Sequence, residues 1–213
     1  MVRDIPFTIE TPGGVVTSHV QDNGKTVGVE VVMHQKLVEF ILRDWQMQDA
    51  SSIAKYADNR KIWRNLRDGF PHPYRIQDAE IFIERVNQAS PRTVFAIATE
   101  SEAIGSIGLV LGEDVHRFTA EMGYWLAEPF WGKGIMTQAV RFLAQWAFRE
   151  LQLHRIYAAP YATNPASHRV LEKAGFIREG ILRSSAFKDG RILDQFLYSR
   201  IAKVDAPPAI EGG

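Results

Sequence analysis

The sequence of 213 residues contains no cysteine. This absence excludes a disulfide framework, a thiolate metal site and covalent catalysis through a cysteine. No apolar run approaches the roughly 20 residues needed to span a bilayer, and no positive segment followed by an apolar one opens the chain. We therefore expect a cytoplasmic protein that does not bind membranes.

The sequence also lacks an excess of charge of either sign. Lys and Arg together number 25, and Asp and Glu together also number 25. Without a basic field the chain is not expected to bind nucleic acid, and without an acidic excess it does not attract polyamines by overall charge. The apolar content of 46% is near the globular average, so one main domain with a sizeable core is expected.

Two nucleotide-binding motifs, GxxxxGK[ST] and GxGxxG, are absent. In their place, a strand-like run that ends at Pro129 is followed by Gly132, Lys133 and Gly134, and then by an amphipathic helical pattern. Glycines allow close approach of a ligand to the backbone, and a helix N-terminus offers free N–H groups and a positive dipole end. The segment predicts either a small diphosphate site or an ordinary turn.

A second segment is marked at both ends as a short helix. Asn164 is a preferred N-cap, Pro165 suits the first helical position and Gly175 suits the position that follows the last turn. Taken alone, these residues could do no more than begin and end a helix.

Together, EMGYWLAEPFWGKGIMTQAV (121–140) and NPASHRVLEKAGF (164–176) resemble the GNAT superfamily of N-acyltransferases. The residue pattern of these segments is most similar to that of the RimJ/RimL-like branch of ribosomal-protein-alanine N-acetyltransferases. The resemblance runs from about Val38 to Ile201 and includes LRDGFPHPY (66–74), a branch-specific segment near the acceptor entrance. It implies an α/β (α+β) fold with a mixed, mostly antiparallel central sheet flanked by helices.

The resemblance also implies a site for acetyl-CoA as cosubstrate, with no metal. The backbone of residues 131–137 would hold the pyrophosphate, the strand 123–126 would lie beside the pantetheine arm, and Asn164 and Ser167 would reach the pantetheine and the thioester. Arg169 and Lys173 could meet the 3′-phosphate. The residues expected to bind the coenzyme are Tyr124, Trp125, Leu126, Trp131, Gly132, Lys133, Gly134, Ile135, Met136, Thr137, Asn164, Ser167 and Arg169.

The sequence departs from the family pattern at two positions. Pro129 stands where the phosphate loop usually opens with Gln or Arg, and little loss is expected because the contacts come mainly from backbone amides. Leu171 stands where many members carry a tyrosine that acts as general acid. Another residue must then protonate the leaving thiolate.

For the proton transfers we expect two catalytic residues. Glu121 is the first choice as general base, because strand alternation places it beside the expected thioester, although a structural ion pair is the alternative. Ser167 is the acid candidate by resemblance, and its alternative is a first-turn helix residue that bonds to backbone. A backbone N–H near Tyr124 to Leu126 would bind the oxyanion. His72 and His116 are weaker candidates, and His168 is expected on a solvated face.

The chain divides into an N-terminal β-rich extension (1–32), a main domain (33–203) and a flexible tail (204–213). In the extension, Asn23-Gly24 is a strong hairpin cue between β-rich runs. The expected elements are strands Phe7–Glu10, Val15–Val20, Thr26–Val32 and Glu39–Arg43, helices Asp49–Tyr56, Arg60–Arg67 and Asp78–Gln88, strands 93–99, 104–111 and 118–126, the helix after the glycines, strand Ile156–Pro160, the short helix, and two strands that turn at Asp189-Gly190.

The function expected from these features is transfer of acetyl from acetyl-CoA to a primary amine by direct attack in a ternary complex. The acceptor would be a protein N-terminus or a small-molecule amine, and the protein could be a homodimer. The alternative is a catalytically silent acyl-CoA-binding module, which the leucine at position 171 keeps open.

Overall fold

The computed structural model describes residues 7–11, 14–18, 33–37 and 40–202, with only the backbone described in the first two segments. Within the extension, β1 (Phe7–Thr11) and β2 (Gly14–Ser18) form a separate antiparallel pair, in agreement with the first two predicted strands. The predicted strand Thr26–Val32, the Asn23-Gly24 turn and the tail 204–213 lie outside the described residues. The three domain boundaries stay predictions.

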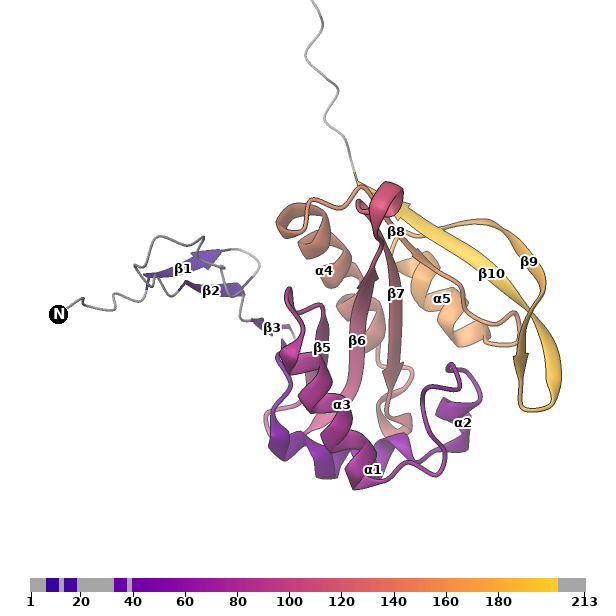
Figure 1. The fold of residues 1–213 in the computed structure, drawn as a ribbon, viewed down its shortest axis with the longest axis horizontal. Helices are drawn as coiled ribbons and strands as arrows, with labels where there is room; N and C mark the ends of the chain where they lie inside the picture. The colour runs from indigo at the N-terminus through magenta and orange to yellow at the C-terminus, as the bar shows by residue number, and fades with distance from the viewer. Residues whose placement is uncertain (1–6, 12–13, 19–32, 38–39, 203–213) are drawn as a thin grey trace, which may run out of the picture.

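The main domain is built on an eight-stranded sheet with the order β3-β4-β5-β6-β7-β8-β10-β9 (Figure 1). All neighbouring strands are antiparallel except β7 and β8, which are parallel. The predicted mixed, mostly antiparallel sheet is therefore confirmed. The strands are β3 (His34–Lys36), β4 (Ile41–Arg43), β5 (Val94–Ala98), β6 (Ala103–Leu111), β7 (Thr119–Leu126), β8 (Arg155–Ala158), β9 (Ile177–Lys188) and β10 (Arg191–Ile201).

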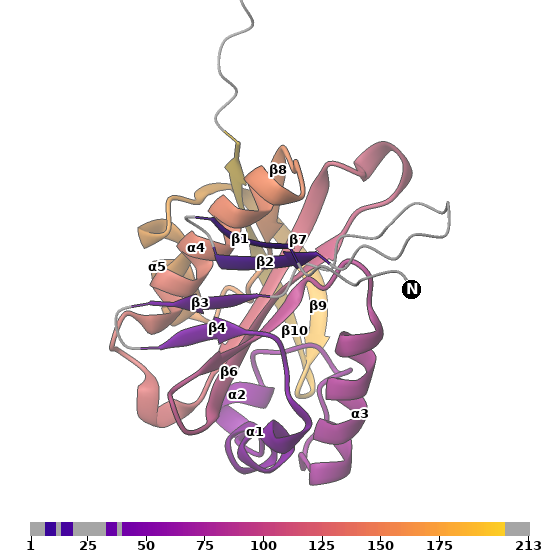
Figure 2. The ribbon, with the colours of Figure 1, turned by 90° about the vertical axis from the view of Figure 1, so that its left-hand side faces the viewer.

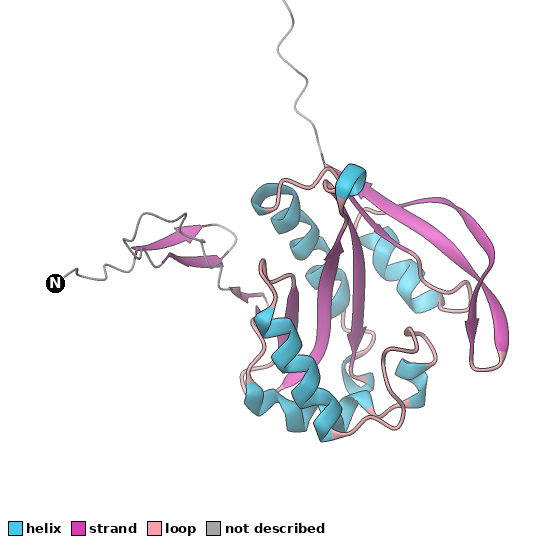
Figure 3. Cartoon of the chain, in the orientation of Figure 1, coloured by secondary structure: helices cyan, strands magenta, loops and turns pink. Residues whose placement is uncertain are grey.

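Helices cover both faces of this sheet (Figure 3). When the molecule is turned by 90°, α4 and α5 lie on one side of the sheet and α3 on the other (Figure 2). The helices are α1 (Ala50–Ala57), α2 (Arg60–Trp63), α3 (Ile76–Gln88), α4 (Ile135–Glu150) and α5 (Pro165–Lys173), with 3-10 turns at Met47–Asp49, Asp114–His116 and Glu128–Phe130.

Each covered face has its own hydrophobic core. On one face, Val140, Leu143 and Ala147 of α4 are fully buried against the sheet, as the helical spacing predicts. On the other face, α1 and α3 pack their apolar sides together over β5 and β6. Because both faces are covered, β6 is buried on consecutive residues from Ala103 to Leu109 and does not alternate between apolar and polar.

Several boundaries differ from the prediction. The helix expected over Arg60–Arg67 is wrong beyond Trp63, because the N–H groups of Asn65 and Leu66 bond to carbonyls three residues back and tighten the chain into turns. The strand predicted over 118–126 is confirmed as β7, whereas the last part of the strand-like run that ends at Pro129 lies in a 3-10 turn. Strand β3 was not predicted.

The pairing of β7 with β8 is short. Thr119, Ala120 and Glu121 pair with Arg155, Ile156 and Tyr157, and no further pair follows toward the carboxyl ends of the two strands. On its other edge, β7 stays paired with β6 as far as Leu126. Residues 122–126 therefore have one paired edge and one open edge, and backbone groups of alternate residues point to the open edge.

We expect Gly105→Ala to destabilise the sheet at this point. A Cβ at Gly105 would lie 2.5 Å from the backbone carbonyl oxygen of Trp125, so β6 and β7 would have to move apart. The expected loss is about 1 to 3 kcal/mol of unfolding free energy, measured by urea denaturation. Gly123→Ala on β7 is the matched control, since a Cβ there meets nothing within 4 Å. Equal stability of the two variants would contradict this description of the β6–β7 contact.

Candidate active site

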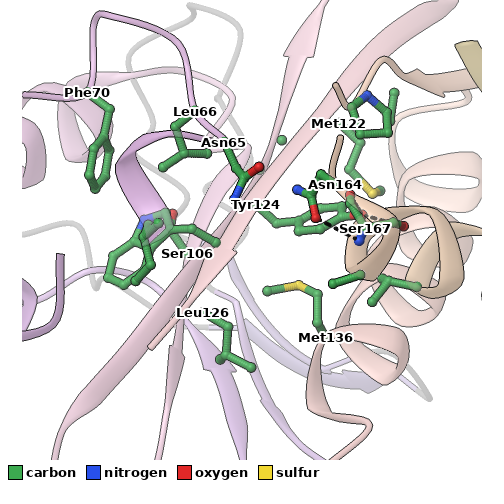
Figure 4. Close-up of a pocket in the computed structure, with 18 of the residues that line it drawn as sticks. Asn65, Leu66, Phe70, Ser106, Met122, Tyr124, Leu126, Met136, Asn164 and Ser167 are labelled. Carbon is green, nitrogen blue, oxygen red and sulfur yellow. Dashed lines mark hydrogen bonds between the residues drawn. The ribbon is translucent and has the colours of Figure 1, made fainter. Parts of the chain in front are cut away.

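A pocket with a volume of about 1560 Å³ lies where β7 and β8 separate. Most of its walls come from α2 with the loop that follows, α3, β6, residues 121–126 of β7, the turn before α4 with the first turn of that helix, and α5 with the end of β8. In the close-up, Tyr124 lies between Phe70 and Leu66 on one side and Asn164 and Ser167 on the other (Figure 4). The pocket thus has two halves that meet at β7.

The first half contains the glycine turn. Gly132 and Gly134 have φ angles of 77° and 78°, in the left-handed region that favours glycine. Helix α4 begins at Ile135 directly after this turn, and no side chain caps its first N–H groups. Ile135, Met136 and Thr137 therefore present backbone donors to the pocket, which is the geometry of an anion site at a helix N-terminus.

Helix α5 forms the opposite wall of this half. The side chain of Asn164 accepts a bond of 3.2 Å from the N–H of Ser167, and Pro165 occupies the first turn, as predicted. Gly175, with a φ of 87°, ends the helix: its N–H bonds to the carbonyl of Glu172, and the N–H of the next residue bonds to that of Leu171. Asn164 and Ser167 both line the pocket, so helix capping and a role in binding are compatible here.

Ser167 is joined to the strand by a hydrogen bond that the sequence did not indicate. The hydroxyl oxygens of Ser167 and Tyr124 lie 2.7 Å apart, and Ser167 is buried. Burial of the Tyr124 phenol raises its pKa well above the usual range, and the bond to Ser167 opposes this shift in part. Tyr124 therefore keeps its proton at neutral pH. Two protonated hydroxyls meet at the junction of the two halves.

Glu121 lies in the same pocket at the point where the β7–β8 pairing ends. Its carboxylate binds the guanidinium of Arg67, which reaches it from the loop after α2. The Glu121 side chain is 22% exposed and that of Arg67 is 75% exposed. The ion pair that was the structural alternative for Glu121 thus exists, and it lies within the pocket.

The other predicted residues divide into two groups. Trp125 and Leu126 line the pocket from β7, Trp131 does so while its indole N–H donates to the Leu126 carbonyl at 2.6 Å, and Arg169 and Lys173 do so from α5. Lys133 is the exception among the predicted coenzyme residues, because it does not line the pocket and its ammonium lies 5.2 Å from the centre of the Phe130 ring.

Three further positions named in the sequence analysis do not line the pocket. Leu171 is fully buried in the core, so this position offers no group to the pocket. His168 is also buried, with its ring 4.8 Å from that of Phe196, so the expectation of a solvated face is wrong. His72 stacks on Trp63 and does not line the pocket.

The second half of the pocket was only partly anticipated. Phe70 packs against Tyr74 and Trp125, with ring centroids 4.8 and 6.0 Å away. Phe70 and Tyr74 belong to the segment 66–74, which the sequence placed near the acceptor entrance. The contribution of α3, with Asp78, Ile81, Phe82 and Arg85, had no local signal and follows from the packing of that helix.

A mixed sheet that opens between two parallel strands, beside a glycine turn and a helix N-terminus, defines the class of acyl-coenzyme A N-acyltransferases. The chain belongs to the GNAT acetyltransferase family, because the model of the acetyltransferase (GNAT) domain matches residues 39–177. The predicted GNAT fold and the predicted enzyme class, an acetyl-CoA-dependent N-acetyltransferase, are confirmed by this membership. Within the described residues, no helix is both long and apolar enough to cross a membrane.

Individual relatives agree with this assignment. The probable N-acetyltransferase YjcK of Bacillus subtilis is 45% identical over 93 residues, which are 44% of this chain and 51% of YjcK. The ribosomal-protein-serine acetyltransferase of Escherichia coli is 35% identical over 116 residues, 54% of this chain and 64% of that protein. The chain thus spans about half to two thirds of these relatives. RimL, a ribosomal L7/L12 α-N-protein acetyltransferase solved with coenzyme A, has the same fold, with a TM-score of 0.71 at 22% identity over 79% of this chain and 97% of RimL.

We expect Gly134→Ala to weaken coenzyme A binding by about tenfold, since alanine costs about 1 kcal/mol or more in the left-handed region and the turn would relax away from its present shape. Calorimetric titration with coenzyme A measures the change. Gly190→Ala is the matched control, because this glycine has a φ of 73° in the β9–β10 turn, outside the pocket. The control should lose similar stability and keep its affinity. Unchanged affinity in Gly134→Ala would remove the glycine turn from the binding site.

Proposed function

We propose that this protein acetylates the α-amine of a protein or peptide N-terminus, with acetyl-CoA as donor and both substrates bound at once. The observation that carries the proposal is the meeting of a carboxylate, a buried hydroxyl pair and an open strand edge in one pocket, between the glycine turn and a separate aromatic half. The likeness to ribosomal-protein acetyltransferases supports a protein acceptor. An α-amine, with a pKa near 8, also needs less help in losing its proton than a lysine amine near 10.4.

In this proposal the coenzyme lies in the half of the pocket formed by α4 and α5. Its pyrophosphate binds the N–H groups from Gly132 to Thr137, and its pantetheine amides pair with the open edge of β7 at residues 122–126. The cationic Arg169 and Lys173 attract the 3′-phosphate. This arrangement brings the thioester to the junction of the two halves.

The transfer then needs one base, one oxyanion donor and one proton for the leaving group. Glu121 takes a proton from the amine, directly or through a water, and the amine nitrogen attacks the carbonyl carbon. A backbone N–H of residues 124–126 donates to the oxyanion. When the carbon–sulfur bond breaks, its electron pair goes to sulfur. Sulfur receives a proton through the Ser167 hydroxyl, which takes up the second proton that the nitrogen loses as the amide forms, so Ser167 ends the step protonated. Tyr124 orients that hydroxyl through the 2.7 Å bond.

The activity is tested by thiol release from acetyl-CoA in the presence of short peptides. Peptides with a free N-terminus should release thiol, and the same peptides with a blocked N-terminus should not. The silent coenzyme-binding module is the alternative, and it predicts tight coenzyme binding with no acceptor-dependent release from any peptide, small amine or polyamine. That second outcome would refute the proposed function.

Glu121→Gln is expected to lower turnover by about 10² or more, in the range typical of a lost general base, and to change its pH dependence. Coenzyme affinity should stay nearly the same. Arg67→Gln is the control, because it breaks the same ion pair and leaves the carboxylate in place. If both variants lose the same activity, Glu121 acts through its ion pair and is not the base.

The roles of Ser167 and Tyr124 are tested together in a double-mutant cycle. Ser167→Ala should lower turnover by a factor of about 10 to 10². Tyr124→Phe should lower it by a few-fold to about tenfold, which corresponds to the free energy of one hydrogen bond. Because Tyr124 acts through Ser167, the double variant should be no slower than Ser167→Ala. Multiplicative losses in the double variant would contradict the assigned roles.

A further inference from the structure

The charged side chains that line the pocket are mostly cationic, although the chain as a whole is neutral. Two of the cations, Arg169 and Lys173, belong to the coenzyme half. The acceptor half has four cations and two carboxylates, which are Lys61, Arg64, Arg67, Arg85, Asp78 and Glu121. A local excess of one sign in a pocket attracts ligands of the other sign.

Both carboxylates of the acceptor half already have partners. Glu121 is held by Arg67, and Asp78 accepts a bond of 2.8 Å from the N–H of Arg75 at the start of α3. Lys61 is paired with Glu128. Arg64 and Arg85 have no ion pair among the described residues, and both are exposed. An acceptor entering this half therefore meets two guanidinium groups without an ion pair, and of the two carboxylates only Asp78 has no cationic partner among the described residues.

The two arginines lie on parts of the chain that contacts with other residues hold in place. Asp68, in the same loop as Arg64, binds the buried ammonium of Lys188 at 2.7 Å, and this ammonium also lies 3.9 Å from the centre of the Trp63 ring. Lys188 is at the end of β9, so the final hairpin fixes the loop after α2. Arg85 lies two turns after Asp78 on the same face of α3, with its guanidinium 5.9 Å from the centre of the Phe82 ring.

Apolar side chains line the pocket together with these arginines. Ile81 and Val110 line the pocket and are 64% and 65% exposed. Phe70, Phe82 and Trp125 lie on the same side of the pocket and are half-buried. An extended acceptor that reaches from β7 to both α3 and the loop after α2 would cover these side chains.

We infer that the acceptor is an N-terminal peptide segment with carboxylate side chains a few residues behind its reacting amine, and that Arg64 and Arg85 recognise those carboxylates. This inference rests on the function proposed above and narrows its acceptor. A polyamine has the opposite charge pattern, since its additional ammonium groups would face the two guanidinium groups, with Asp78 as the one carboxylate of this half that has no cationic partner among the described residues.

The test compares peptides that have the same first residue and length, with acidic, neutral or lysine residues at the next positions, and it includes spermidine. The acidic peptide should have a kcat/KM about tenfold or more above the lysine peptide, and this preference should shrink as salt screens the charges. The Arg64→Glu and Arg85→Glu double variant should invert the order. The matched control is Arg183→Glu with Arg191→Glu, an equal charge change on the exposed hairpin outside the pocket, which should keep the original order.

Two results would overturn the inference. One is a kcat/KM of the unchanged protein for the lysine peptide or spermidine that equals or exceeds its kcat/KM for the acidic peptide. The other is the same change in the ranking of the peptides by kcat/KM in both double variants. If no amine is turned over, the proposed function fails, and binding of the same peptides to the coenzyme A complex still decides the charge preference. Tighter binding of the lysine peptide would then reject the inference on its own. The neutral variants Arg64→Gln and Arg85→Gln provide a second set if the reversed charges prevent folding.

Discussion

The early end of the pairing between β7 and β8 is the constraint on which the site depends. Only Thr119, Ala120 and Glu121 take part in that parallel ladder, while β7 continues beside β6 for five more residues. A strand held on one edge and open on the other offers its backbone groups to a ligand without losing its own position. The open edge, the base candidate Glu121 and the hydroxyl pair all lie at this one place.

Two helices begin at the opening, and their first turns have different roles. The turn before α4 has glycines in left-handed conformations and leaves the first N–H groups of the helix uncapped. The start of α5 is capped by Asn164, and that cap fixes Ser167 in the first turn, where it meets Tyr124. One helix N-terminus is thus suited to an anion, and the other holds a hydroxyl in a fixed place.

Local signals explain what the sequence could predict. The glycine turn, the Asn164 cap, the Gly175 end and the apolar face of α4 are encoded within a few residues each, and all are present in the structure. The contacts of Glu121 with Arg67 and of Tyr124 with Ser167 join residues 54 and 43 positions apart, which no local pattern specifies. The same limit explains the shortened α2, whose following loop is held by Lys188 from the far end of the chain.

We propose that the opening between β7 and β8 holds the acetyl donor and sets the geometry of transfer. A crystal structure of the complex with coenzyme A tests this claim most directly. We expect the pantetheine amides to bond to the backbone of β7 between Met122 and Leu126, with the pyrophosphate against the N–H groups from Gly132 to Thr137. A coenzyme bound elsewhere, with the edge of β7 unoccupied, would contradict it.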